Sequence, residues 1–273
     1  MRKVLTVVMA ALVIGAATPM AQSASADGAR AGYDLLLDTY VRDGLVYYRA
    51  LKSDRTKLDG FLSAVGGASL DGVARNDAVA FWLNAYNALV LRTVIDHYPI
   101  PQRTREYPAR SIRQIPGAFE RTPRRVAGRS ITLDQIEQTV LSSFNDPRLF
   151  LALGRGAVGS GRLRSEAFTG ANLERQLADV AIECVRRARC VDLDSGANSL
   201  RVSSIFAWRE RDFTATFASK AAAAFGSRSP MERAVLAFMA PTLLTTEREF
   251  IEQNQFQVRV IPFDWSLNEL SAH

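Results

Sequence analysis

One long apolar segment, ARNDAVAFWLNAYNALVLRTVIDHYP at residues 74–99, constrains the fold more than any other feature. From Phe81 to Leu91 it is apolar nearly all round, which is typical of a helix buried on every side. We expect Asn76 to cap the start of this helix and Pro99 to end it, since proline cannot continue a helix. The segment therefore predicts a central buried helix at about residues 75–98, around which the rest of the chain must build a core.

Asn84 and Asn87 lie three residues apart on this predicted helix and so share one face of it. Buried amides cost free energy unless their donors and acceptors are satisfied. The two side chains are therefore expected either to clamp neighbouring backbone or to face a polar pocket.

Helical and strand-like segments alternate along the rest of the chain. Amphipathic helices are predicted around residues 28–44, 134–144 and 169–187, and another contains Leu58 to Val65 and ends at Gly66-Gly67. Strands are predicted at 45–51, 148–153, 199–203 and 257–265. RVAGRSITL predicts a hairpin that turns at Ala127-Gly128, and Thr132 and Gln135 have capping-box spacing. This order predicts an α+β fold: one compact, helix-rich domain over residues 27–273 with a small sheet.

The first 26 residues have the form of a secretory signal. Arg2 and Lys3 precede an apolar stretch, and Ala24-Ser25-Ala26 supplies an A-x-A cleavage site, so Asp27 is the expected mature start. No later stretch is judged long and apolar enough to cross a membrane. The sequence therefore predicts an exported protein of the periplasm or extracellular space, without a transmembrane anchor.

The net charge is modest. Loss of Arg2 and Lys3 with the signal lowers the formal charge from +6 to +4. A nucleic-acid-binding protein normally carries a stronger basic excess on one face, so no nucleic-acid partner is expected.

The two cysteines, Cys184 and Cys190, are six residues apart. On an intact helix their Cα atoms would lie about 9 Å apart along the axis, beyond disulfide reach, so a bridge requires the helix to end between them. Whether they are bridged stays open. With no histidine nearby they do not form a metal site, and neither a metal nor a cofactor is expected.

The segment LFLALGRGAVGSGRLRSEAF contains Gly154, Gly156 and Gly159 in the spacing of a dinucleotide-binding turn. Gly161 follows at once and disfavours the helix that such a turn requires. A nest for an anion, assisted by nearby arginines, and a plain surface loop are the remaining interpretations. Those arginines are Arg155, Arg162 and Arg164.

His97 is the sole histidine apart from the terminal His273. It suits the C-terminal end of the central helix, and it is also the one candidate general base within the fold. Eight arginines between residues 103 and 129 form either a solvated loop or a patch for polyanions.

Several segments in one order carry a resemblance to a known family. They include FWLNAYNALVLRTVIDHYP, ITLDQIEQTVL, NDPRLFLAL and LRSEAFTGANLERQL. The chain resembles the domain of unknown function 547 (DUF547) family over nearly the whole mature length. That family occurs in bacterial exported proteins and at the C-terminal end of some plant proteins, and it has no general assigned activity.

The chain departs from the family pattern at the positions that carry reactive groups. The resemblance implies cysteines where this chain has Arg155 and Ser160, and a histidine where it has Gln138. It also implies prolines at Gly161 and Arg162. A thiol beside an imidazole is typical of cysteine-hydrolase or transglutaminase-like chemistry. Arginine is neither a nucleophile nor a base, and glutamine cannot accept a proton, so the glycines are interpreted as relaxed substitutions in a former functional loop.

Three functional hypotheses follow. The first is a pseudoenzyme that binds an anionic small molecule, peptide or envelope ligand in a pocket formed by Asn84, Asn87, Arg155, Arg162 and Arg164. The second is an acyl-transfer enzyme with Ser160 as nucleophile and His97 as base. The third is a scaffold that binds polyanionic envelope surfaces through residues 103–129.

Overall fold

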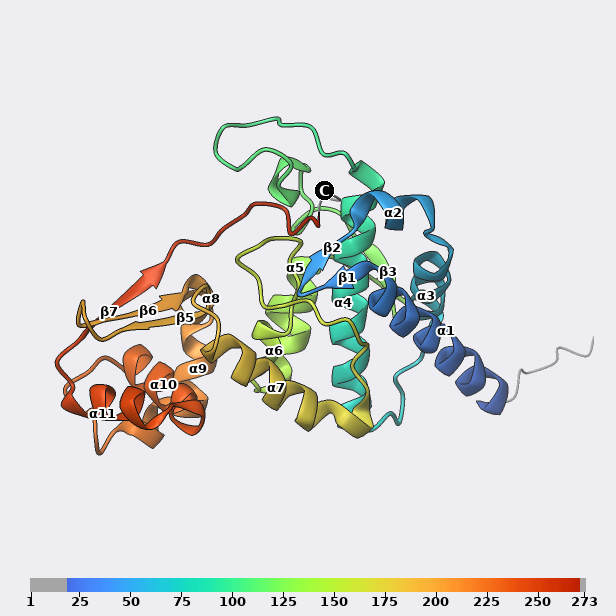
Figure 1. Cartoon of the computed structure of the whole chain (residues 1–273). Helices are drawn as coiled ribbons and strands as arrows, with labels where there is room; N and C mark the ends of the chain where they lie inside the picture. Colours follow the sequence, from blue (N-terminus) through green and yellow to red (C-terminus); the bar gives the residue numbers. More distant parts are fainter. Residues whose placement is uncertain (1–18, 271–273) are drawn as a thin grey trace, which may run out of the picture.

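Helix α4, Arg75–His97, stands at the centre of the fold. The computed structural model describes residues 19–270, and side chains from residue 27 onward. Helices α2 and α3 pack against α4, while α1 packs on α3 (Figure 1). The bounds of these three helices are Pro19–Tyr40 for α1, Tyr48–Ser53 for α2 and Thr56–Gly67 for α3. The predicted α+β fold with a central buried helix is thereby confirmed.

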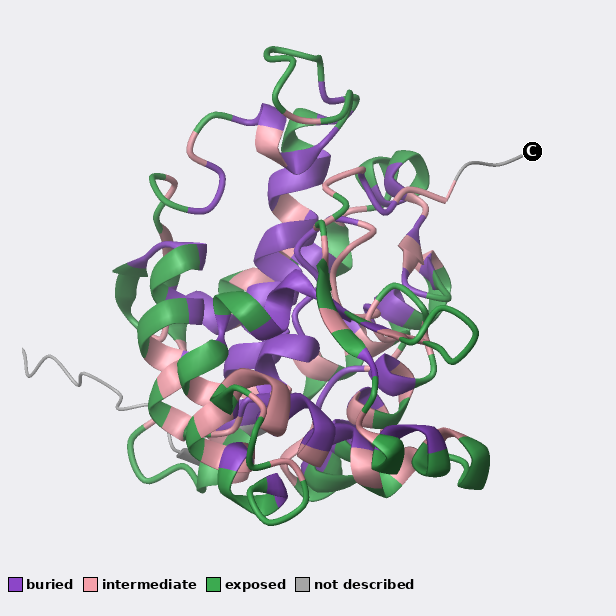
Figure 2. Cartoon of the chain, turned by 90° about the vertical axis from the view of Figure 1, so that its left-hand side faces the viewer, coloured by how far each residue is buried: buried purple, intermediate pink, exposed green. Residues whose placement is uncertain are grey.

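Burial of α4 follows from its sequence. Buried side chains run from Val79 to Ile95 with few interruptions, and Figure 2 shows the helix as mostly buried. The helix begins at Arg75 after Ala74, whose side chain offers no cap, and Asn76 lies inside the first turn. The expectation that Asn76 is the N-cap was therefore wrong by two residues.

The length and hydropathy of α4 correct a second expectation. Within the described residues, α4 is the one helix long and apolar enough to cross a membrane by these criteria, although the sequence was judged to contain none. Its most apolar window of 18 residues is 83% buried inside the protein. The apolar surface of α4 is thus used by the core.

Two short hairpins flank the helices. β1 (Val41–Arg42) pairs with β2 (Leu45–Val46), and β3 (Arg124–Val126) pairs with β4 (Arg129–Ile131). The second hairpin turns at Ala127 and Gly128, both at positive φ, as a two-residue hairpin turn requires. This confirms the turn predicted from the sequence.

The segment after the second hairpin is helical throughout but changes its hydrogen-bond pattern. It runs through α5 (Leu133–Gln135), a π-helical segment (Ile136–Leu141) and a 3₁₀ turn (Ser142–Phe144). The predicted capping box of Thr132 and Gln135 is present in both directions. The π-helical segment carries Glu137, whose role is described below.

The predicted strand at 148–153 is instead helix α6, Arg148–Leu151. The backbone N–H of Arg148 donates to Asp146 Oδ1 at 3.0 Å, which starts the helix after Pro147. A short apolar run buried on all sides does not distinguish a strand from a helix by periodicity, which is why the prediction was wrong. The predicted strand at 45–51 is likewise limited to β2, because α2 begins at Tyr48.

The C-terminal part of the chain adds a three-stranded sheet and more helices (Figure 1). In this sheet β5 (Val191–Asp194) pairs antiparallel with β6 (Ser199–Ser203), which pairs parallel with β7 (Gln257–Ile261). The connection from β6 to β7 contains α8 (Ser204–Trp208), α9 (Glu210–Phe217), α10 (Pro230–Met239) and α11 (Thr245–Gln253). Helix α7, Leu173–Val185, leads into this part from the centre.

One continuous cluster of buried side chains joins the helices around α4 to the C-terminal sheet and its helices. It extends from Tyr33 on α1 through Leu83 on α4 and Phe206 on α8 to Met239 on α10. The segment after β7 then returns across the molecule toward β2, where Val46 N donates to Asn268 O at 2.9 Å (Figure 1).

Candidate functional site

The glycine loop, residues 152–168, lies against α4 and is held there by a buried asparagine. Asn84 Nδ2 donates to Phe168 O at 2.8 Å, and Asn84 Oδ1 accepts from Phe168 N at 2.9 Å. With both groups of the amide paired to backbone, Asn84 clamps the end of the loop. It also lines a mostly apolar cavity of about 610 Å³ between α1, α3 and α4.

Asn87 holds the start of the same loop. Its Nδ2 donates to Ala152 O at 3.2 Å, and its Oδ1 accepts from Gly154 N at 2.8 Å. The three-residue spacing thus places two amides against two points of one loop. The structure therefore presents the pair as backbone clamps, one of the two interpretations that the sequence left open.

The glycines of the loop are required by close packing. A Cβ on Gly161 would lie 1.6 Å from Leu151 O, and one on Gly159 would lie 2.7 Å from Asp264 N. Gly156 has a φ of +66°, which favours glycine. The interpretation of these glycines as relaxed substitutions was wrong. The dinucleotide pattern is also accidental, because α6, not a strand, precedes it and the next helix, a 3₁₀ turn, begins only at Gly170.

Arg155 is buried and paired within the protein. Its Nη2 and Nε donate to the two carboxylate oxygens of Glu137 at 2.7 and 3.1 Å, and its Nη1 donates to Phe150 O at 3.2 Å. The Arg155 side chain is 3% exposed. Its guanidinium therefore serves an internal ion pair instead of the ligand pocket that the sequence analysis assigned to it.

The pair stays charged despite its burial. Burial alone would raise the pKa of Glu137, but the attraction of Arg155 and its hydrogen bonds hold that pKa below the ordinary value. Burial alone would lower the pKa of Arg155. The Glu137 carboxylate outweighs burial and raises that pKa above its usual range. Tyr86 adds a third member, since its hydroxyl donates to Glu137 Oε2 at 3.2 Å.

Arg209, which follows the last residue of α8, lies beside Gln138. Its guanidinium donates to Gln138 Oε1 and to Ser142 Oγ, pairs with Asp212 at 2.8 Å and lies 3.6 Å over the Phe150 ring. Burial, partly offset by Asp212, lowers the pKa of Arg209. The position where the family resemblance expects an imidazole is thus bonded to a second arginine.

Ser160 and His97 lie in different surroundings. Ser160 Oγ accepts a hydrogen bond from Arg155 N at 3.0 Å, whereas the exposed His97 has its Nδ1 2.9 Å from Thr93 O, one turn earlier on α4. Across residues 19–270, no hydrogen bond joins these two side chains. The structure does not bring the pair together as a nucleophile and its base.

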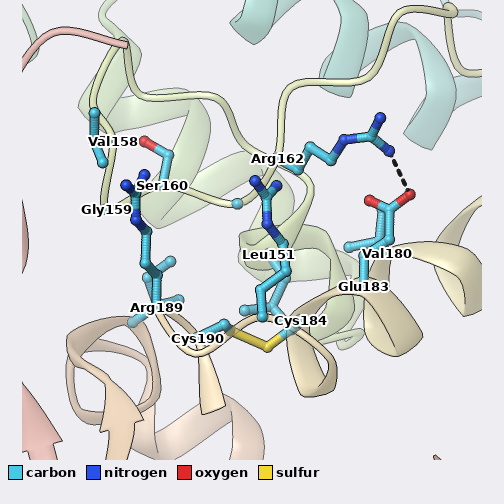
Figure 3. Close-up of a pocket in the computed structure, with 13 residues that line it drawn as sticks. Leu151, Val158, Gly159, Ser160, Arg162, Val180, Glu183, Cys184, Arg189 and Cys190 are labelled. Atoms are coloured by element: carbon cyan, nitrogen blue, oxygen red, sulfur yellow. Dashed lines mark hydrogen bonds and ion pairs between the residues drawn. A yellow bond between two sulfur atoms is a disulfide. The ribbon is translucent and has the colours of Figure 1, made fainter. Parts of the chain in front are cut away.

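Ser160 faces a small cavity of about 30 Å³, which we name the arginine pocket (Figure 3). Its polar lining side chains are Ser160, Arg162, Glu183, Arg187 and Arg189, and the disulfide forms one wall. Three arginines stand against Glu183 and against Asp43 at the edge of the pocket, which leaves one net positive charge. The volume accepts one or two water-sized groups, which suits the terminal group of a ligand.

Arginines at the edge of the pocket differ in how far they are neutralised. Arg162 pairs with Glu183 at 2.8 Å and with Asp43 at 3.1 Å, and Arg187 lies 3.5 Å from Asp43. Arg189 is exposed and extends toward Ser160 in Figure 3. Among the side chains that the structure describes, no carboxylate forms an ion pair with Arg189.

Arg164 does not line the arginine pocket. It pairs with Glu166 at 2.7 Å, Glu183 at 3.4 Å and Asp179 at 3.6 Å. With three carboxylates around one guanidinium, Arg164 is neutralised within the protein. Of the three arginines predicted to bind a ligand, Arg162 alone reaches this pocket.

The disulfide links Cys184 to Cys190 with their Cα atoms 5.1 Å apart. Helix α7 ends at Val185, so the chain turns between the two cysteines as a bridge requires. The closed loop carries Arg187 and Arg189, and the bridge therefore holds two of the pocket arginines in place.

Removing the bridge is expected to lower stability measurably. The double variant Cys184→Ser, Cys190→Ser lacks the cross-link that closes this short loop. We expect its free energy of unfolding to be lower by about 2 kcal/mol. Urea unfolding with and without reductant measures the loss. Reductant should affect the native sequence and leave the double variant unchanged; equal stability of the two proteins would contradict the bridge.

Sequence reasoning missed Glu137 and Arg209. Neither stands in a recognisable motif, and the one available signal was that Arg155 falls in an apolar run, where a buried arginine needs a carboxylate partner. In the part of the chain that the structure describes, no group of three histidine, cysteine or acidic side chains is placed to hold a metal ion.

Comparison with known protein families gives a match. The family model described as "Protein of unknown function, DUF547" matches residues 70–184, a range that contains α4, the glycine loop and all of α7 except its last residue. Neither the curated proteins nor the solved structures include a match to the chain. The resemblance predicted from the sequence is confirmed over that range: residues 70–184 of this chain resemble the DUF547 family of proteins of unknown function.

Proposed function

We propose that the chain is a non-catalytic, exported binding protein that holds the anionic terminal group of a ligand in the arginine pocket. The observation that carries this proposal is that Ser160, Arg162, Arg187 and Arg189 line one cavity whose charged groups leave a net positive charge. Guanidinium groups bind carboxylates and phosphates through charge-assisted hydrogen bonds. Arg189 has its donors available for such a group.

The absence of catalysis is inferred from the three positions where the family resemblance implies reactive groups. Arg155 is paired with Glu137 inside the protein, and Gln138 accepts from Arg209. Ser160 Oγ has a backbone N–H as its partner instead of a general base. Without a base to remove its proton, a serine hydroxyl is a weak nucleophile.

Export is supported by the signal-like residues 1–26, which lie mostly outside the residues that the structure describes. The disulfide is consistent with it, because such bonds form and persist in oxidising compartments. We place the mature protein in the periplasm or extracellular space, with cleavage near Ala26.

Inorganic phosphate is the probe that tests the pocket. At low ionic strength we expect phosphate to raise the melting temperature of the protein, because a ligand that binds only the folded state stabilises it. Replacing Arg189 with alanine should weaken phosphate binding about tenfold, since it removes a charge-assisted hydrogen bond. Isothermal titration calorimetry measures the affinity.

Arg129→Ala is the matched control, since Arg129 is an exposed arginine on β4 and is not one of the residues that line the arginine pocket. It should bind phosphate as the native protein does. If phosphate, sulfate and acetate all leave the melting temperature unchanged, the proposal fails. Ester hydrolysis that disappears in Ser160→Ala would favour the acyl-transfer hypothesis instead.

A further inference from the structure

A row of aromatic rings lies outside the arginine pocket. Trp208 packs on Phe263 with ring centroids 4.7 Å apart, Phe263 on Trp265 at 4.4 Å, and Trp265 on Tyr107 at 6.2 Å. We name these four residues the aromatic row. Trp208 is 48% exposed, and the other three are partly exposed. A contiguous group of exposed rings, unlike a single exposed residue, is typical of an interaction site.

Backbone pairing holds the row in place. Gly159 N donates to Asp264 O and Val158 N donates to Ser266 O, each at 2.8 Å. These bonds flank Trp265 on both sides and fix the segment after β7 along the glycine loop. The aromatic row is therefore presented by ordered backbone and lies next to the arginine pocket.

Tyr107 is held by a buried glutamine. Gln114 is 1% exposed, and its Nε2 donates to the carbonyls of Thr104, Tyr107 and Pro108 at 3.0, 2.9 and 3.2 Å. Its Oε1 accepts from the backbone N–H of Arg103 at 2.7 Å. Five hydrogen bonds, including one from Thr104 N, thus shape this segment, for which the sequence left a solvated loop and a patch for polyanions open.

Arginines accompany the rings. Arg113 lies 4.5 Å over the Trp265 ring and pairs with Glu120. Arg103, Arg105 and Arg121 are exposed, and in residues 27–270 none of the three forms an ion pair. The same surface carries the carboxylates of Glu106, Glu120 and Asp264, so its four arginines exceed its acids by one positive charge.

We propose that the aromatic row and these arginines form a binding surface for an acidic polysaccharide. The C–H faces of sugar rings pack on aromatic rings, and the arginines complement the carboxylates of such a chain. Nucleic acid also stacks on aromatic rings, but the modest net charge of the chain disfavours it. The surface shares no residue with the arginine pocket, so it stands independently of the function proposed above.

Alginate oligomers, which are polyuronates, are the probe, and neutral dextran is the comparison. At 50 mM salt we expect alginate to bind and to change the tryptophan fluorescence, and dextran to bind far more weakly. Affinity should fall at 500 mM salt, because salt screens exposed charges. Trp208→Ala should weaken alginate binding about tenfold, as loss of an aromatic anchor does.

Tyr47→Ala is the matched control, since Tyr47 is a partly exposed ring at the start of α2. It should bind alginate as the native protein does. Arg189→Ala should also retain alginate binding, so failure of the arginine pocket and failure of this surface are distinguishable. No binding of alginate, equal binding of dextran, no effect of Trp208→Ala, or tighter binding of a thymidine oligonucleotide would each overturn the proposal.

Discussion

Replacing Arg155 with alanine is expected to lower the free energy of unfolding by about 3–5 kcal/mol. The substitution leaves the Glu137 carboxylate buried without its counter-charge. Keeping an unpaired charge out of water costs more free energy than burying an unpaired neutral group, so the loss of stability is large. Two strong hydrogen bonds are lost with it, at 2.7 and 3.1 Å. Urea unfolding followed by circular dichroism measures the change.

The exposed pair of Arg175 and Asp179, 3.3 Å apart on α7, supplies the control. Arg175→Ala should cost less than about 1 kcal/mol, because solvent screens an exposed ion pair. The combined variant Arg155→Met with Glu137→Leu should recover most of the loss, since it removes both charges together. A loss below 1 kcal/mol in Arg155→Ala alone would contradict the buried pair.

The same pair predicts a pH dependence. Because folding lowers the pKa of Glu137 below its ordinary value of 4.5, the charged carboxylate stabilises the fold above that pH. This contribution is lost as the pH falls through the lowered folded pKa. The stability gap between the native protein and Glu137→Gln should therefore be widest near pH 7 and narrow in acid. A gap of constant size would contradict this assignment.

Replacing Asn84 with alanine is expected to lower the free energy of unfolding by about 2–4 kcal/mol. It leaves the buried N–H and C=O of Phe168 without partners, and each unsatisfied group costs about 1–3 kcal/mol. Hydrogen exchange provides a local readout beside urea unfolding: the Phe168 amide should lose protection, while the Gly154 amide, bonded to Asn87, keeps it.

Asn76→Ala is the control on the same helix, because the structure gives the Asn76 side chain no cap role. Its effect should stay within about 0.5 kcal/mol. Unchanged protection of Phe168 in Asn84→Ala, together with unchanged stability, would show that the amide faces a ligand site and not the loop backbone.

Local sequence patterns correctly predicted the structural features that depend on residues close together in the chain. The apolar length of α4, the Ala127-Gly128 turn and the capping box at Thr132 each depend on contacts within a few positions of sequence. The order of elements also predicted the α+β class. The strand predicted at 148–153 was wrong, because a short buried apolar run fits a helix as well as a strand.

The candidate sites depend on contacts between distant residues. Glu137 meets Arg155 across 18 positions, and Asn84 meets Phe168 across 84. The aromatic row joins Tyr107 to Trp265, and no periodicity in the chain relates these positions. Local propensity acts over one or two turns of helix, whereas the partner of a buried charge or ring is chosen by packing, which depends on the whole folded chain.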